Sequence, residues 1–435
     1  MSLREKSAKR MDFKMTNLTG LIGIFAMMAI SLGMSENRQA IKWKPIAIAV
    51  GMQFILAILI AGIPKLGIKG PLNPLFKLAN DAIGSILSHV DKGTDFLFGT
   101  LGHPEVIGSY IFAVKVLPTI VFFAAFMGVL YHYGIMQKIV HGLSWVMYRF
   151  LNISGAESLS TAGNIFLGQT EAPLLIKPYV GEMTRSEIMC IMVGGFANVA
   201  GGVLAAYVGM LAGMIPEIAA HLLTVSVMSA PASIVFAKII VPETKTPKTA
   251  DTLVKDKKSI YTNGIEAAAT SAFEGTQLAI TIGGMLLAFI ALLSFGNSII
   301  GWFADKAHLT AIVGQPVSLE LILGWIFAPF AWCLGVANEH IAYAGQLLGK
   351  KIILNEFVAY MDFAQNGKTM DQRSAVIMSY ALCGFANFSS IAIQIGGIGS
   401  LAPNKKSEIA SLGLKAMIAG MFASAMCGAI IGLFI

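Results

Sequence analysis

The sequence predicts an all-α polytopic membrane protein. About eight transmembrane helices and two re-entrant hairpins are expected in inverted repeats, with two broken helices and interfacial amphipathic helices. Three observations predict this fold class. The composition is strongly apolar, many apolar runs are long enough to cross a bilayer, and the tetrapeptide Gly-Phe-Ala-Asn occurs at 195–198 and again at 384–387. In each copy, a glutamate (Glu171, Glu356) precedes the tetrapeptide at the end of an interrupted apolar run.

The composition is that of a membrane protein. Apolar residues make up 56% of the chain and charged residues 13%, and the mean hydropathy is +0.72. Soluble domains carry roughly 25% charged residues, so this chain lacks the polar surface that a water-soluble protein of its size needs. Several stretches of about 20 apolar residues match a hydrocarbon core roughly 30 Å thick.

The net charge of +7 does not indicate nucleic-acid binding, because the basic residues fall mainly in connecting segments. There they are explained as topology signals and lipid anchors. The four cysteines lie singly in apolar stretches, without metal-ligand or disulfide spacing. No HExxH, paired CxxC or nucleophile elbow occurs, and the segment 345–351 resembles a phosphate loop only incompletely, so we do not expect an enzyme.

Eight apolar segments are predicted to span the membrane. The segment 72–90 has apolar residues on one helical face, which is typical of a helix on the membrane surface or one packed against another subunit. A second amphipathic segment follows the third span, with Trp145, Tyr148 and Arg149 suited to a membrane interface. The predicted spans are 18–34, 45–63, 110–131, 186–211, 218–241, 278–295, 375–401 and 409–435.

Two segments are too broken for one spanning helix and too apolar for an aqueous loop. The first covers 154–180, and the second pairs 321–336 with 341–360. We interpret both as re-entrant hairpins, since non-helical backbone at membrane depth needs surrounding protein or a water-filled cavity. The spans around Asn198 and Asn387 are expected to be broken helices.

Four regions are predicted from this pattern. Residues 1–150 hold three spans and the interfacial helices, 151–242 form the first repeat, 243–316 are a loop and one span, and 317–435 form the second repeat. Five lysines between 245 and 258 favour a cytoplasmic position for that loop, with Arg38, Lys138, Arg185 and Lys405 on the same side. The basic N-terminus then falls outside, against the same rule.

Glu171 and Glu356 are the candidate functional carboxylates, because a charge within the membrane costs on the order of 3 kcal/mol. The alternative is that each caps a half-helix or pairs with a buried base such as Lys115. Asn164 and Asn198, with unwound carbonyls, have the oxygen chemistry of a sodium site. They serve equally well to satisfy their own loops.

Four motifs resemble those of the bacterial concentrative nucleoside transporters. They are Leu-Pro-Thr-Ile at 117–120, Asn-Ile-Phe-Leu-Gly-Gln-Thr-Glu-Ala-Pro at 164–173, Asn-Glu-Phe-Val-Ala-Tyr at 355–360, and Gly-Phe-Ala-Asn-Phe-Ser-Ser at 384–390. The resemblance extends over essentially all eight spans. It implies a homotrimer in the bacterial inner membrane, in contact with lipid. It also implies a scaffold, mainly 1–150 and 243–316, and a transport domain made of the two repeats, 151–242 and 317–435, that moves as an elevator.

The resemblance also implies a role for each matched residue. Sodium would be held by Asn164 and Asn198 and by the carbonyls of Leu167 and Val199, although Asn198 stands where the family has a smaller hydroxyl residue. The nucleobase would be read by Gln169, Thr170 and Glu171. The ribose would be bound by Glu356, Asn387 and Ser390, with Phe385 packed nearby.

The predicted function is therefore import of nucleosides, uridine and other pyrimidine nucleosides among them, by sodium symport. Nucleic acid is not an expected partner. Proton coupling is the first alternative, because some members of the family use it. An uncoupled channel or facilitator is the second, and a membrane-embedded enzyme is the third.

Overall fold

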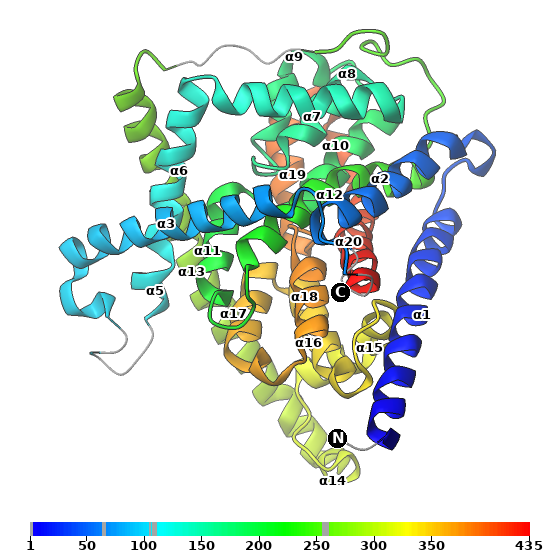
Figure 1. Ribbon diagram of the computed structural model, residues 1–435, viewed down its shortest axis with the longest axis vertical. Helices are drawn as coiled ribbons and strands as arrows, with labels where there is room; N and C mark the ends of the chain where they lie inside the picture. Colours follow the sequence, from blue (N-terminus) through cyan, green and yellow to red (C-terminus); the bar gives the residue numbers. More distant parts are fainter. Residues whose placement is uncertain (1–2, 63–66, 104–105, 107–110, 255–260) are drawn as a thin grey trace.

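The computed structural model describes residues 3–62, 67–103, 106, 111–254 and 261–435, with side chains from Leu18 onward. Helices account for most of the described chain (Figure 1). All eight predicted spans correspond to helices, and six helical stretches are long and apolar enough to cross a membrane. Tyr110, at the predicted start of the third span, and Lys255, Lys257 and Lys258 lie outside the described residues.

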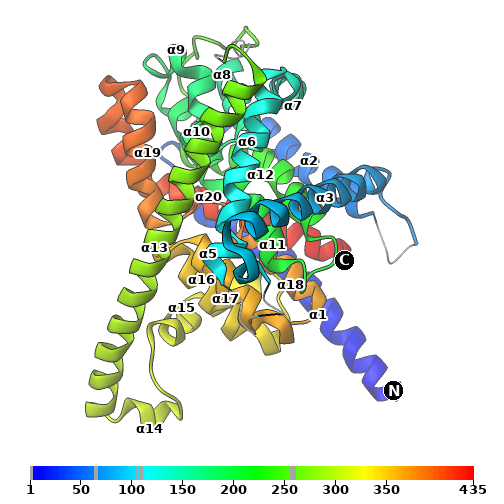
Figure 2. The ribbon, with the colours of Figure 1, turned by 90° about the vertical axis from the view of Figure 1, so that its left-hand side faces the viewer.

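The helices at the periphery keep apolar surface uncovered. In the most apolar stretch of α13 (Gly264–Lys306), 17% of the residues are buried, whereas 83% are buried in that of α12 (Ile218–Ile240). α13 is therefore suited to contact lipid, and α12 belongs to the protein core. α13 packs along α6, and Figure 2 shows it as a long tilted helix at the edge. The other peripheral helices are α1 (Leu3–Gly33), α2 (Trp43–Ala61), α3 (Asn73–Phe98), α5 (Phe112–Lys115) and α6 (Leu117–His132).

The first repeat is a hairpin followed by a broken helix and a continuous one. Capping boxes begin two of its helices: the Ser154 hydroxyl accepts from the Glu157 N–H, and the Thr184 hydroxyl from the Glu187 N–H. The helix break covers 198–200, as the sequence predicts. The elements are α8 (Gly155–Gly163), η4 (Ala172–Ile176), α9 (Lys177–Val180), α10 (Arg185–Ala197), α11 (Gly201–Leu211) and α12.

The second repeat follows the same order, but its hairpin differs from the prediction. The helix breaks at 354–355, so α16 (Ile341–Ile353) and α17 (Glu356–Asn366) are the two arms that meet at Glu356. Tyr343 Oη donates to the Asp362 carbonyl at 3.1 Å, which places the arms side by side and antiparallel. The predicted first arm, 321–336, is instead mainly α15 (Leu319–Cys333), which packs against α16 from outside the hairpin.

The broken helix of the second repeat is α18 (Gln372–Leu382) followed by α19 (Phe388–Leu401), and α20 (Lys406–Phe434) ends the chain. Arg185, at the start of α10, donates to Ser411 near the start of α20 at 3.0 Å. Arg373, at the start of α18, donates to the Gly432 carbonyl near the end of α20 at 2.9 Å. Since α10 and α18 begin at opposite ends of one helix, the repeats are inverted, as predicted.

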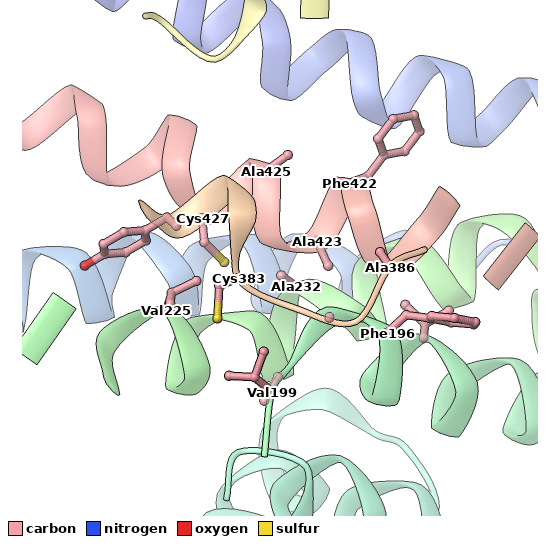
Figure 3. Close-up of a cluster of buried hydrophobic side chains, with 14 of the residues drawn as sticks. Phe196, Val199, Val225, Ala232, Cys383, Ala386, Phe422, Ala423, Ala425 and Cys427 are labelled. Atoms are coloured by element: carbon pink, nitrogen blue, oxygen red, sulfur yellow. The ribbon is translucent and has the colours of Figure 1, made fainter. Parts of the chain in front are cut away.

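The two helix breaks meet at the centre of the molecule. Gly384 has a φ of +105°, and a Cβ there would lie 2.6 Å from the Phe196 carbonyl oxygen, so only glycine fits between the breaks. Figure 3 shows Phe196 at the end of α10 and Val199 of the first break among the same buried side chains as Cys383 and Ala386 of the second. The repeated tetrapeptides therefore contact each other directly.

The connections predicted to share one side do lie at one end of the molecule. Arg185 donates to both carboxylate oxygens of Glu36 at 2.9 Å, Asn404 donates to the Gly181 carbonyl at 2.9 Å, and Lys248 pairs with Glu182. α7 (Ile135–Leu151) lies at this end, and the N-terminus and α14 (Leu309–Val313) lie at the other (Figure 1).

Candidate functional site

The first hairpin reaches the second repeat through Gln169. Its side chain is buried, and its Nε2 donates to Ser390 Oγ at 3.1 Å. The side-chain Oε1 of Gln169 accepts from Gln394 Nε2 at 3.1 Å, and Gln394 Nε2 also donates to the Met192 backbone carbonyl at 3.1 Å. A Cβ on Gly195 would lie 2.9 Å from both Gln169 and Gln394, so the first tetrapeptide's glycine makes room for this contact.

The second hairpin brings a buried carboxylate to the same helix. Glu356 opens α17, whose first turn is capped by Asn355. Glu356 accepts from Tyr207 Oη at 3.0 Å and from Asn387 Nδ2 at 2.9 Å. Asn387 in turn caps α19, where its side-chain oxygen accepts from the Ser390 N–H at 2.9 Å. A continuous polar network thus joins both hairpin tips at the start of α19.

The remaining predicted substrate residues lie beside this network. Thr170 packs on α19, where a Cβ on Gly397 would lie 2.6 Å from its methyl group. Glu171 Oε2 accepts from the Gly168 N–H at 3.1 Å, and Glu171 is an exposed residue. Phe385, half-buried, packs against the hydrophobic core. The structure therefore joins Gln169, Glu356, Asn387 and Ser390 by hydrogen bonds and leaves Glu171 outside that network.

The predicted sodium ligands meet at the first helix break. Asn164 is fully buried at the end of α8, and both its Oδ1 and Nδ2 have no hydrogen-bond partner among the described residues. A Cβ added to Gly194 of α10 would lie 3.1 Å from the Asn164 Nδ2, so Asn164 packs closely against α10. Asn198 contacts the Gly194 carbonyl at 3.5 Å and accepts from Ser229 Oγ at 2.6 Å. Leu167 lies in the non-helical segment between α8 and η4, and Val199 lies in the break between α10 and α11.

An unpartnered buried amide costs about 1–3 kcal/mol, so the Asn164 amide is available to a polar ligand. A cation bound by oxygen atoms would engage its Oδ1. Asn198, the departure from the family pattern, does present a side-chain oxygen, and the Ser229 hydroxyl fixes that oxygen in place.

Sequence reasoning missed several polar residues of the site. Tyr207 lies in the predicted span 186–211, after the break at Asn198, and Gln394 lies four residues after Ser390, on the same helical face. Both are polar groups inside apolar spans, which was the available signal. Lys115, the suggested partner for a buried glutamate, pairs instead with Asp91 at 2.9 Å. The buried base near Glu356 is Lys351, at the end of the segment that resembles a phosphate loop.

The network suits an uncharged ligand with polar groups at both ends. One end offers amide groups on Gln169 and Gln394, and the other offers the Glu356 carboxylate and Asn387. A carboxylate that accepts from ligand hydroxyls forms charge-assisted hydrogen bonds, which are roughly twice as strong as neutral ones. No arrangement of nucleophile and base is found among these groups.

Comparison with known proteins gives the family. The Na+ dependent nucleoside transporter N-terminus and C-terminus families match residues 22–101 and 221–432, and the family described as Gate, nucleoside recognition, matches 113–214. The chain is 40% identical to the uncharacterized transporter YutK of Bacillus subtilis, over 97% of this chain and 100% of YutK. It is 37% identical to mouse solute carrier family 28 member 3, over 96% of this chain but only 59% of that protein.

Solved structures agree with this assignment. CNTnw in an inward-facing substrate-bound state is 39% identical and aligns over 96% of this chain and 98% of that one, with a TM-score of 0.86. A CNTnw variant in an outward-facing state aligns with a TM-score of 0.87 over 97% of this chain and 99% of that one. Sodium is the co-transported ion of the family named by these matches. The chain belongs to the Na+-dependent nucleoside transporter family.

Proposed function

We propose that this protein imports nucleosides, uridine and other pyrimidine nucleosides among them, by symport with sodium. The observation that supports this most strongly is the network from Gln169 through Ser390 and Asn387 to Glu356, in which both hairpin tips present polar groups to one buried region. Such a region binds a ligand with two polar ends, as a nucleoside has, better than it binds an ion or an apolar solute.

The two ends of the nucleoside have different partners in this proposal. Gln169, Thr170 and Glu171 on the first hairpin read the nucleobase. Glu356, Asn387 and Ser390 bind the ribose hydroxyls, with Phe385 beside them. A site of this kind rejects analogues that lack the hydroxyls, because its own buried acceptors are then left unpaired.

Sodium binds in this proposal at the first helix break, with Asn164, Asn198 and the carbonyls of Leu167 and Val199 as ligands. The support is that Oδ1 and Nδ2 of buried Asn164 have no hydrogen-bond partner in the residues that the structure describes. Asn164 and Gln169 lie on the same short tip between α8 and η4. Because one segment carries an ion ligand and a substrate ligand, sodium that orders the tip also favours nucleoside binding.

Alternating access follows in this proposal from an elevator motion of residues 151–242 and 317–435 against the scaffold of 1–150 and 243–316. The helices α10, α12, α18 and α20 pack on one another, as expected for a body that moves as a unit. A cavity of about 490 Å³ lies between α3 and α6 on one side and α11 and the start of α12 on the other. Such a gap between the two bodies leaves room for sliding.

The assembly in this proposal is a homotrimer in the bacterial inner membrane, in contact with lipid. Exposed leucines on α3 support a contact with a neighbouring subunit or with lipid: Leu75 and Leu78 are 60% and 66% exposed in the single chain. A neighbouring subunit or the acyl chains of lipid would cover such residues. Crosslinking of the detergent-purified protein tests the stoichiometry, and a monomer at all crosslinker concentrations would contradict the trimer.

Uptake of labelled uridine into proteoliposomes tests the transport proposal. Accumulation above the external concentration under an inward sodium gradient is the expected result. Accumulation under a proton gradient alone would replace sodium with protons, and equilibration without accumulation would indicate an uncoupled facilitator. Chromatography of the recovered label detects any chemical alteration, which would indicate an enzyme.

Substitution of Glu356 with Gln tests the ribose contact. Loss of the charge weakens hydrogen bonds from the ribose hydroxyls, so the KM for uridine should rise roughly tenfold or more. Glu339→Gln is the matched control, because Glu339 belongs to the same repeat and its side chain is 73% exposed. Unchanged uridine transport by Glu356→Gln would remove this residue from the site.

A further inference from the structure

Lys351 is a fully buried lysine with every donor satisfied. Its Nζ donates to the Ala381 carbonyl at 2.8 Å, to the Cys383 carbonyl at 3.0 Å and to Ser424 Oγ at 3.1 Å. An ammonium has three N–H donors, so all of them are used. Two of the acceptors belong to the end of α18, where the helix breaks and its last carbonyls lack partners within the helix.

The first repeat has a matching place, because the repeats are inverted copies. There the end of α8 lies against the end of α10, and in the second repeat the end of α16 lies against the end of α18. Asn164 occupies this position in the first repeat and Lys351 in the second. The continuous helix of each repeat contributes a serine hydroxyl to this place, Ser229 in α12 and Ser424 in α20. The two serines lie at similar distances from the C-terminal ends of their helices.

The two places differ in what they contain. Within the described part of the chain, Asn164 has two buried polar atoms without partners, whereas the Lys351 ammonium is completely hydrogen-bonded. Lysine supplies a compact positive charge of its own, and carbonyl and hydroxyl oxygens are the groups that bind sodium in unwound membrane helices. An ammonium and a sodium ion thus call for the same surroundings.

We infer that Lys351 is a tethered cation, which takes in the second repeat the place that the proposed sodium ion takes in the first. It holds the end of α18 and thereby the break that presents Asn387. Lys351 is therefore a positioning residue for ribose recognition. The second repeat then needs no ion, so one sodium ion accompanies each nucleoside; this inference rests on the proposed sodium symport.

The test uses the full-length protein in proteoliposomes. Labelled sodium and labelled uridine fluxes are measured together, and the wild-type protein should move one sodium ion per nucleoside. Lys351→Asn replaces the ammonium with an amide oxygen beside two carbonyls and a hydroxyl, a set of oxygens that accepts sodium. At low sodium its KM for uridine should rise about tenfold or more, since the loss of hydrogen bonds from a charged group is of that size.

High sodium should restore uridine transport by Lys351→Asn, with a steeper dependence on sodium than in the wild type. A purely structural role would not respond to sodium in this way. Lys350→Asn is the matched control: Lys350 pairs with Asp362 at 2.7 Å, away from the helix break, and its loss should leave the sodium steepness unchanged.

Three results separate the possibilities. Two sodium ions per nucleoside in the wild type would overturn the inference, whether or not any variant folds. A Lys351→Asn protein with wild-type KM and sodium dependence would overturn it as well. Absence of any sodium-driven uridine accumulation by the wild type would instead refute the proposed function on which the inference rests.

Discussion

Replacing Tyr207 with Phe removes one hydrogen bond from the Glu356 carboxylate and little else. The hydroxyl donates to Glu356 Oε1 at 3.0 Å, and the ring stacks on Tyr360 with centroids 4.2 Å apart, a contact that Phe keeps. A hydrogen bond to a charged group contributes about 1.5–3 kcal/mol, and about 1.4 kcal/mol is a tenfold change in binding. If this bond orients Glu356 for the ribose, the KM for uridine should rise about 10- to 100-fold in Tyr207→Phe.

Tyr360→Phe is the matched control. Tyr360 is also fully buried and belongs to the same stacked pair, but its hydroxyl donates to the Ser379 carbonyl at 2.5 Å rather than to Glu356. This variant should lose thermal stability without a comparable rise in KM. Competition by 2′,3′-dideoxyuridine adds a second measurement, since a ligand without the hydroxyls should bind Tyr207→Phe and the wild type equally. Equal KM values in the two variants would refute the reasoning.

Three further predictions concern other parts of the molecule. Gln394→Leu removes the donor to Gln169, so competition assays should show weaker binding of nucleobase analogues by about fivefold, the size of one neutral hydrogen bond. Asn164→Ala removes a proposed ion ligand, so the half-saturating sodium concentration should rise about tenfold at unchanged maximal uptake. Hydrogen bonds from Arg185 lower the pKa of Glu36 to about 2 from 4.5, so this carboxylate stabilises the fold above pH 4.5 and loses that effect as the pH falls toward 2. Glu36→Gln should lower the Tm at pH 7 and flatten its acid dependence in thermal unfolding.

Much of the fold was predictable because apolar length and broken runs constrain a membrane chain strongly. The breaks at Asn198 and Asn387 appear where the tetrapeptides predict them. The second hairpin was misplaced because α15 and α16 are both apolar helices of similar length. The sequence feature that marks the true turn of this hairpin is Asn355. Its side chain accepts from the Val358 N–H and caps the new helix that begins at Glu356.

The hydrogen-bonding partners in the site were less predictable. Glu356 and Asn387 are found by motif, but their bond joins α17 to α19, and the bond from Tyr207 comes from the other repeat. Such partners depend on how inverted repeats interlock, which residue spacing along the chain does not specify. Gln394 was visible only as a polar residue in an apolar span.

The contact between the two helix breaks gives ion binding a route to the substrate site. Gly384 lies so close to the Phe196 and Ala197 carbonyls that a Cβ would be 2.6 and 2.8 Å from them. A movement of the first break, where sodium is proposed to bind, therefore displaces the second, where Asn387 holds Glu356. Close-packed interiors transmit such shifts because they leave few voids to absorb them. The duplicated tetrapeptide thus places the break proposed to bind sodium and the break proposed to face the ribose in direct contact.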